Sequence, residues 1–253
     1  MPRPHRLSHL LLASAITLAG VAPAAAFTPE ETGQIEGIVR DYLIRNPQVL
    51  LEALDALEEQ RAGEMQDQQR EAIAQAQGEL TATPPGTALG NPEGDVTIVE
   101  FFDYNCGFCR RSHADMTTLI ENDPELRFVL KEIPVLGPES EQAARVSLAV
   151  RHIAPDRYPD FHDGLLTTEG VADESTALAV ASDLGLEEDA VREAMDDPAV
   201  LGALQESARL ATMLQITGTP SYVIGDELVP GAVGAEALAA RVANVRECGR
   251  ATC

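Results

Sequence analysis

The sequence predicts an α/β protein in which a small sheet is interrupted by a helical insertion and preceded by an N-terminal helical extension. Three observations predict this fold class. Short β-favouring apolar runs at 96–102 and 127–131 flank a helical segment, a helical pattern runs from 139 to 216, and β-favouring residues return at 221–229. A strand–helix–strand unit implies parallel strands, and a short, mainly apolar run implies a strand that is covered on both faces.

The first 26 residues have the pattern of a secretory signal peptide. Arg3 and Arg6 form a basic segment, residues 10–22 are apolar but too short to span a bilayer, and Ala24 to Ala26 fits the small-residue rule for cleavage. We therefore expect residues 1–26 to be a cleaved signal peptide. The mature chain is expected in the periplasm, where disulfides persist.

The segment 27–84 is predicted to be helical. Thr28-Pro29-Glu30-Glu31 is typical of a helix N-terminus, and Asn46-Pro47 indicates a break followed by a restart. The restarted helix carries an apolar stripe at Leu50, Leu54 and Leu57. Because an exposed apolar helix face usually marks an interface, we expect residues 27–80 to form a homo-oligomer, a dimer or trimer.

The run Thr83-Pro84-Pro85-Gly86 is a linker signal. We place the catalytic domain after it, at 85–253, with the helical insertion at about 138–216. Within this domain the order is strand–helix–strand, a block of helices, then two strands and a final helix.

Composition limits the class of partner. The chain has 253 residues, 45% of them hydrophobic, which is enough to bury a core. Its net charge is −23, and Lys131 is its only lysine. An acidic surface argues against nucleic acid and anionic membranes as partners.

The motif Cys106-Gly107-Phe108-Cys109 directly follows the first strand and opens a helix. Unpaired N–H groups and the positive end of the helix macrodipole favour a thiolate there, so Cys106 is the expected nucleophile, and the helix turns Cys109 inward. A zinc site would need two more ligands, and Cys248 and Cys253 are far away along the chain. A structural disulfide suits this tight spacing poorly. We therefore expect a redox pair that needs no cofactor and binds no metal.

Gly218-Thr219-Pro220-Ser221 lies immediately before a strand. Together with the strand–CxxC–helix unit, the helical block and the hairpin, it resembles the DsbA family of the thioredoxin superfamily. The resemblance implies a thioredoxin-like fold, a cis peptide bond before Pro220 and a backbone at Thr219 that binds an extended substrate strand. An ordinary turn proline is the alternative, since only about 5–6% of such bonds are cis.

The resemblance extends to two charged residues. It implies that Glu100 and Lys131 form a pair beneath the disulfide, with Glu100 as the proton acceptor that tunes Cys109. Glu100 interrupts an apolar run, which costs free energy unless the carboxyl has a partner or a role. A structural ion pair or a solvated charge at the strand end is the alternative.

The two residues between the cysteines depart from the Pro-His pair of the best-known DsbA. With Gly107-Phe108 no histidine adds positive charge next to Cys106, so we expect a milder oxidant. The pair is closer to the Gly-Tyr of periplasmic isomerases, and Phe108 should border a substrate-binding surface. His113 is expected to be a solvated helix residue.

Two further features complete the interpretation. Cys248 and Cys253 are expected to form a local structural disulfide, with a second redox pair as the alternative. The segment from Asp41 to Leu54 is similar to the extension of the ScsC-like (suppressor of copper sensitivity) branch of the DsbA family, in which the extension mediates self-association.

These features predict a periplasmic, isomerase-like thiol–disulfide oxidoreductase. Its expected partners are unfolded or misfolded exported proteins with cysteines and a membrane redox protein. One alternative is a monomeric DsbA-like dithiol oxidase. Others from different classes are a copper- or zinc-binding thiol protein and a scaffold assembled by the long helix.

Overall fold

The computed structural model describes residues 27–253, so the expected signal peptide lies outside the described residues. The chain divides into two compact units, one ending at Glu59 and the other spanning Gln60–Cys253. Within the described part of the chain, no helix combines the length and the apolar character needed to cross a membrane.

The first unit contains helix α1, Pro29–Arg45. Thr28 caps it: its hydroxyl accepts from the N–H of Glu31, and the Glu31 carboxylate accepts from the N–H of Thr28. Helix α2, Gln48–Thr81, starts in this unit and continues into the second. No residue of α1 is buried, and the predicted stripe of Leu50, Leu54 and Leu57 is exposed.

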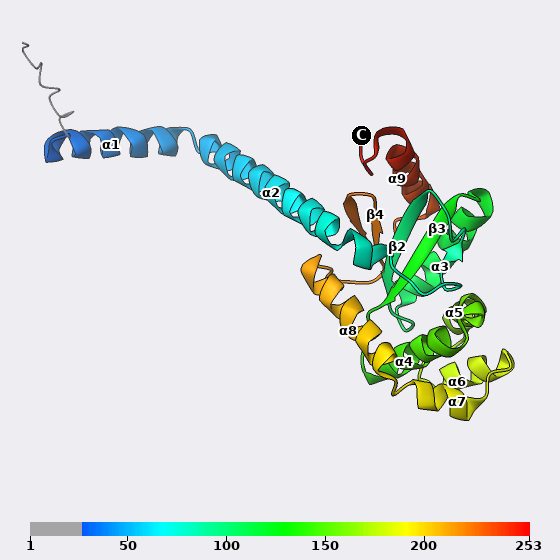
Figure 1. The fold of residues 1–253 in the computed structure, drawn as a ribbon. Helices are drawn as coiled ribbons and strands as arrows, with labels where there is room; N and C mark the ends of the chain where they lie inside the picture. Colours follow the sequence, from blue (N-terminus) through cyan, green and yellow to red (C-terminus); the bar gives the residue numbers. More distant parts are fainter. Residues whose placement is uncertain (1–26) are drawn as a thin grey trace, which may run out of the picture. The chain divides into compact units, whose positions relative to one another are not determined.

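The second unit is built on a five-stranded sheet with the strand order β1-β3-β2-β4-β5 (Figure 1). The strands are β1 Leu89–Gly90, β2 Val96–Phe102, β3 Leu126–Glu132, β4 Ser221–Ile224 and β5 Glu227–Pro230. β2 and β3 are parallel as predicted, and the other pairs are antiparallel. The two-residue strand β1 has no counterpart in the sequence prediction, since it is too short to produce a pattern.

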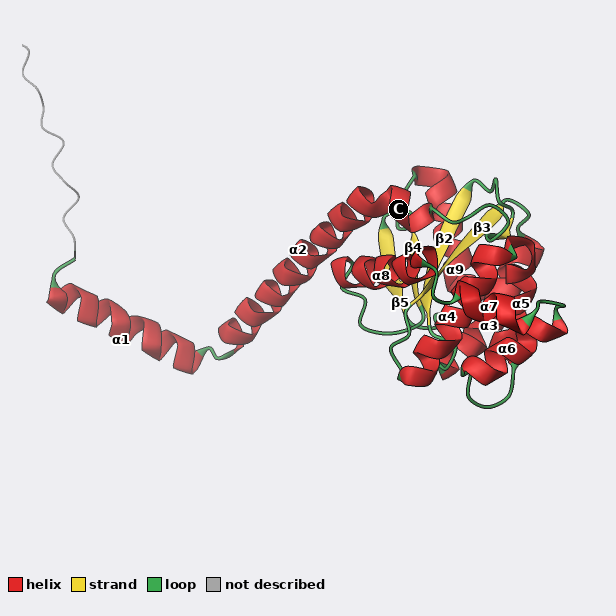
Figure 2. Ribbon diagram, turned by 60° about the horizontal axis from the view of Figure 1, so that its bottom comes forward, coloured by secondary structure: helices red, strands yellow, loops and turns green. Residues whose placement is uncertain are grey.

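Helices cover both faces of this sheet (Figure 2). The helices of the second unit are α3 Gly107–Asn122, α4 Pro138–Ile153, the 3-10 turn Pro155–Arg157, α5 Tyr158–Thr167, α6 Glu174–Asp183, α7 Glu188–Ala194, α8 Pro198–Met213 and α9 Ala235–Cys248. One face packs against α3, α9 and the insertion helices α4 to α7, and the other against α8 and the C-terminal part of α2. The predicted helical insertion therefore includes α5, which has no separate counterpart in the sequence prediction.

The C-terminal part of α2 belongs to the core of the second unit. Ile73, Ala76 and Leu80 are at most 2% exposed and pack with Val99 and Phe101 of β2. The division expected at residues 84 and 85 therefore differs from the structure, in which the second unit begins at residue 60. Three apolar residues on one helix face, together with α8, cover this face of the sheet, although the stripe looks sparse in the sequence.

Truncating Leu80 should show that α2 is part of this core. We expect Leu80→Ala to lower the free energy of unfolding by roughly 2–5 kcal/mol, because it opens a cavity under the sheet. Leu201 on α8 is 39% exposed, and the matched change Leu201→Ala should cost about 1 kcal/mol or less. Urea unfolding measures both values. Equal, small losses in the two variants would exclude α2 from the core.

Candidate active site

The two cysteines of the CxxC motif lie where β2 passes into α3. Cys106 is the N-cap residue of α3 with an extended backbone, and its N–H donates to the carbonyl of Asp103 at 3.0 Å. Its side chain makes no capping bond, so the sulfur is not committed to the helix end. Cys106 is 7% exposed and Cys109 is 1% exposed, and both are thiols. Cys106 is thus the more accessible of the two, although both are buried.

The loop before β4 reduces the exposure of Cys106. The peptide bond Thr219–Pro220 is cis, and the Cys106 sulfur lies 3.2 Å from the carbonyl oxygen of Thr219, to which it donates. A shallow cavity of about 280 Å³ runs beside this loop, lined by Phe108, residues 217–221 and residues 230–232. The structure therefore brings the CxxC motif, Thr219 and Pro220 together at one edge of the sheet.

Glu100 lies beneath the cysteines on the face of β2 that packs against α3. It is buried opposite Tyr222 of β4. Burial raises the pKa of Glu100 to about 8; the hydroxyl of Tyr222 opposes this rise, and the nearby Asp115 adds to it. Glu100 therefore keeps its proton at neutral pH.

Cys109 shares this buried environment. Burial raises the pKa of its thiol, a hydrogen bond from the backbone of Asp103 partly offsets the rise, and Glu100 and Cys106 add to it. Glu100 is thus close enough to Cys109 for their charges to interact. Tyr222, which the sequence analysis did not identify, joins the same group, and burial together with Glu100 raises its pKa as well.

Lys131 does not pair with Glu100, which corrects the expected pair beneath the disulfide. In the parallel register Lys131 stands opposite Phe101, whereas Glu100 stands opposite Leu130. Neighbouring residues on a strand point to opposite faces of the sheet, so Lys131 faces α2 and α8 instead of α3. Its ammonium group donates to the carbonyls of Glu79 and Ala82 and to the carboxylate of Glu206. Lys131 therefore caps the C-terminus of α2.

Asp103, directly after β2, organises the loops around the cysteines and was missed in the sequence analysis. It is 2% exposed. Its carboxylate accepts from the N–H groups of Asn105, Val135 and Leu136 and from the hydroxyl of Ser140. It therefore ties the turn that carries Cys106 to the loop after β3, where Val135 and Leu136 are exposed. A lone aspartate after a strand gives no sequence signal for this role.

His113 is less solvated than expected. Its side chain is only 10% exposed, and its Nε2 lies 2.7 Å from Asp163 of α5. Its ring also packs near that of His162, whose pKa burial lowers to about 3, with the charge of His113 as a second cause. His162 therefore stays neutral in the core at neutral pH.

Cys248 and Cys253 form a disulfide that closes the end of α9. The adjacent Ala251 donates its N–H to Asp226, in the turn between β4 and β5. That turn lies beside the start of β2, because Ile224 pairs with Ile98, whereas the CxxC motif follows the other end of the strand. The disulfide is therefore remote from the CxxC motif.

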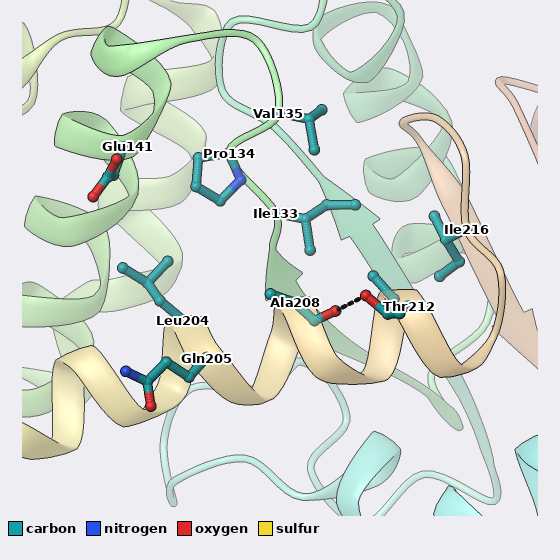
Figure 3. Close-up of a pocket in the computed structure, with 10 residues that line it drawn as sticks. Ile133, Pro134, Val135, Glu141, Leu204, Gln205, Ala208, Thr212 and Ile216 are labelled. Carbon is teal, nitrogen blue, oxygen red and sulfur yellow. Dashed lines mark hydrogen bonds between the residues drawn. The ribbon is translucent and has the colours of Figure 1, made fainter.

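A larger cavity of about 440 Å³ lies between α8 and the loop after β3 (Figure 3). Its walls are mainly apolar, including Ile133, Leu204 and Ile216, and the hydroxyl of Thr212 is satisfied by the carbonyl of Ala208. Neither cysteine lines it. Among residues 27–253 no three His, Cys, Asp or Glu side chains are grouped as metal ligands.

Comparisons with known proteins bear on both units. A family model described as the DSBA-like thioredoxin domain matches residues 97–243, and one described as the copper resistance protein ScsC N-terminal domain matches residues 31–64. The crystal structure of a thioredoxin-like oxidoreductase from Silicibacter pomeroyi DSS-3 is 42% identical, with a TM-score of 0.63 over 67% of this chain and 96% of that chain. ScsC from Proteus mirabilis in a transitional conformation is 28% identical, with a TM-score of 0.62 over 87% of this chain and 96% of that chain.

A curated relative is much longer than the matched region. The Na(+)/H(+) antiporter NhaA 3 of Salinispora tropica is 26% identical over 155 residues, which is 60% of this chain and 24% of the antiporter. The chain therefore spans about a quarter of the length of that relative.

The raised pKa of Glu100 predicts a specific pH dependence of stability. Between pH 4.5 and about 8 the folded chain holds a proton on Glu100 that the unfolded chain has lost, so stability falls as pH rises through this range. The Glu100→Gln variant has no titrating group at this position, so its stability lacks this pH dependence. The stability of the reduced wild type relative to Glu100→Gln should therefore fall by up to about 1.4 kcal/mol per pH unit.

Urea unfolding of both reduced proteins at pH 5, 6, 7 and 8 measures this difference. Glu121→Gln, which neutralises an exposed carboxyl group on the same helix α3 as Cys109, is the matched control and should show no such slope. A difference between wild type and Glu100→Gln that stays constant over the four pH values would contradict a buried, protonated Glu100.

Proposed function

The chain belongs to the family of DSBA-like thioredoxin domains, and on that premise we propose that it is an isomerase-like oxidoreductase that rearranges disulfides in exported proteins. The family model covers more than half of the chain, so the predicted DsbA resemblance and its thioredoxin-like fold are confirmed. The chain is thus a thiol–disulfide oxidoreductase. The match to the ScsC N-terminal domain identifies the ScsC-like branch.

The observation that carries the proposed reaction is the contact between the Cys106 sulfur and the Thr219 carbonyl, 3.2 Å apart. An extended substrate that pairs with the Thr219 backbone would bring its own sulfur to Cys106. The Cys106 thiolate attacks one sulfur of a substrate disulfide, a mixed disulfide forms, and the other substrate sulfur leaves as a thiolate. That thiolate can then attack a different disulfide of the same substrate, or Cys109 can resolve the intermediate.

Glu100 supplies the proton route that Cys109 needs. When Cys109 attacks the mixed disulfide, its thiol must lose a proton, and the fraction of Glu100 that is deprotonated near neutral pH is the buried acceptor beside it. When the Cys106–Cys109 disulfide is reduced, the departing Cys109 sulfur takes a proton back from Glu100. A group whose pKa is raised to about 8 exchanges a proton in both directions near neutral pH.

Self-association supports isomerisation rather than simple oxidation. The stripe of Leu50, Leu54 and Leu57 is exposed and lies within residues 31–64, the segment that matches the ScsC N-terminal domain. An oligomer through residues 27–59 brings several CxxC sites to one misfolded substrate and raises the effective concentration of the attacking thiolate. We assign the protein to the periplasm on the signal-peptide pattern of residues 1–26, with a membrane redox protein that resets its thiols.

A copper-binding thiol protein is the second candidate, because the matching N-terminal model is described as part of a copper resistance protein. Cys106 and Cys109 would be its soft ligands. Copper(I) titration alongside an insulin-reduction assay separates the two functions, since an oxidoreductase turns over many insulin molecules without metal.

The two cysteines should have different roles. Cys106→Ser should abolish exchange, because the attacking sulfur is lost, whereas Cys109→Ser should accumulate mixed disulfides, because the resolving thiol is lost. Non-reducing gels of each variant after incubation with a scrambled substrate measure this. Replacing both Cys248 and Cys253 by serine is the control and should leave exchange intact. A Cys109→Ser variant that releases substrate as fast as wild type would refute the assignment.

Assembly and isomerisation should be lost together. A mature chain shortened to begin at residue 60 keeps Ile73 and Leu80 in the core but lacks the leucine stripe. We expect it to be monomeric by light scattering, to reduce insulin as fast as the full mature chain, and to lose most of its activity on scrambled multi-disulfide substrates. A full mature chain that is already monomeric at tens of micromolar would instead favour the dithiol oxidase.

A further inference from the structure

A positive charge lies against the two residues between the cysteines. The guanidinium carbon of Arg111, two residues after Cys109 on α3, is 4.3 Å from the centroid of the Phe108 ring. Its Nη1 is 3.6 Å from the position that a Cβ atom on Gly107 would occupy. Arg111 therefore lies on Phe108 and beside Gly107, and it places a positive charge where the dipeptide itself carries none.

The N–H groups of Arg111 are available to a ligand. Within the described residues, Arg111 makes no ion pair or side-chain hydrogen bond, in contrast to Arg246, which is held by Asp95 and Asp123. Arg111 is exposed, and the aromatic ring holds its planar group while leaving the N–H edge free. A guanidinium edge of this kind binds a carboxylate through two parallel hydrogen bonds.

The neighbouring arginine is used differently. Arg110 turns inward, where it donates to the carbonyl of Tyr104 at 2.8 Å and to that of Thr168 at 2.6 Å. Arg110 therefore fastens the active-site turn to the helical insertion, and Arg111 is the one of the two whose charge faces solvent.

The position of Phe108 connects Arg111 to the expected path of a substrate. Phe108 is 59% exposed and lines the shallow cavity beside Thr219 and Pro220. A peptide that lies along Thr219 therefore passes the Phe108 ring on which Arg111 rests. The chain as a whole carries a net charge of −23, so most of its surface repels acidic peptides and the charge of Arg111 is a local exception.

We propose that Arg111, supported by Phe108, is a specificity-determining residue that binds the carboxylate of an acidic side chain close to the reacting cysteine of the substrate. The inference deepens the proposed function and rests on it. Disulfides with an acidic neighbour are then attacked in preference to those with a neutral one. The contact aligns the substrate and forms no covalent bond.

The test uses the full mature protein and two disulfide-bonded peptides that differ only in having Glu or Gln beside the reacting cysteine. For wild type we expect kcat/KM to be about twofold to fivefold higher for the Glu peptide at low ionic strength, the range of an exposed ion pair. Arg111→Gln should bring this ratio to about one, and Arg111→Lys should keep part of it, because lysine retains the charge but not the planar fork.

Arg157→Gln is the matched control, since it removes one exposed positive charge from the 3-10 turn outside the active site. It should keep the wild-type ratio. An equal loss of preference in Arg157→Gln and Arg111→Gln, or a preference that survives in Arg111→Gln, would overturn the role of Arg111. The Gln peptide distinguishes the exchange function from the specificity. If wild type does not turn over the Gln peptide, the exchange function itself is refuted. If wild type turns over both peptides equally, only the specificity is refuted.

Discussion

The alternation of side chains along β2 and β3 is the constraint on which the active site depends. Successive residues of a strand point to opposite faces, so the register of the parallel pair decides which groups meet. Glu100 is directed to the α3 side, where Cys109 and Tyr222 lie, and Lys131 to the side covered by α2 and α8. A shift of β3 by one residue would turn Lys131 to the α3 side and leave a buried ammonium group beneath the cysteines. One face of the sheet thus carries the chemistry, and the other joins the catalytic unit to the long helix.

The chemistry on the α3 face uses neutral groups. Burial raises the pKa values of Glu100, Cys109 and Tyr222 together, so none of these groups needs to be charged in the core at neutral pH. This arrangement avoids the large free-energy cost of an unpaired buried charge. Because Glu100 lies beside Cys109 and its pKa is about 8, it can still give up or take a proton when the sulfur changes its bonding.

Two polar side chains, the buried Asp103 and the half-buried Asn105, hold the rim of the site in place. Asp103 fixes the loop with Val135 and Leu136, and Asn105 exchanges hydrogen bonds with Ala172 in the loop before α6. The rim therefore presents apolar side chains on anchored loops, with the guanidinium of Arg111 on the Phe108 ring as its positive charge. A rim of this kind suits an unfolded polypeptide, since it offers apolar contacts and one charged contact close to the CxxC motif.

The sequence by itself determined the strand–CxxC–helix unit with Cys106 and Cys109, the helical insertion, and the final hairpin and helix. These follow from local patterns: an apolar run, a helix start, a proline before a strand. It also singled out Glu100, because a carboxylate inside an apolar strand is conspicuous. Only the tertiary structure decided that Lys131 caps α2 instead of pairing with Glu100, that the second half of α2 completes the core through Leu80, and that Asp103 and Arg111 organise the active-site rim. Each of these depends on strand register or on contacts between residues far apart in the chain, and periodicity and spacing along the sequence carry no information about either.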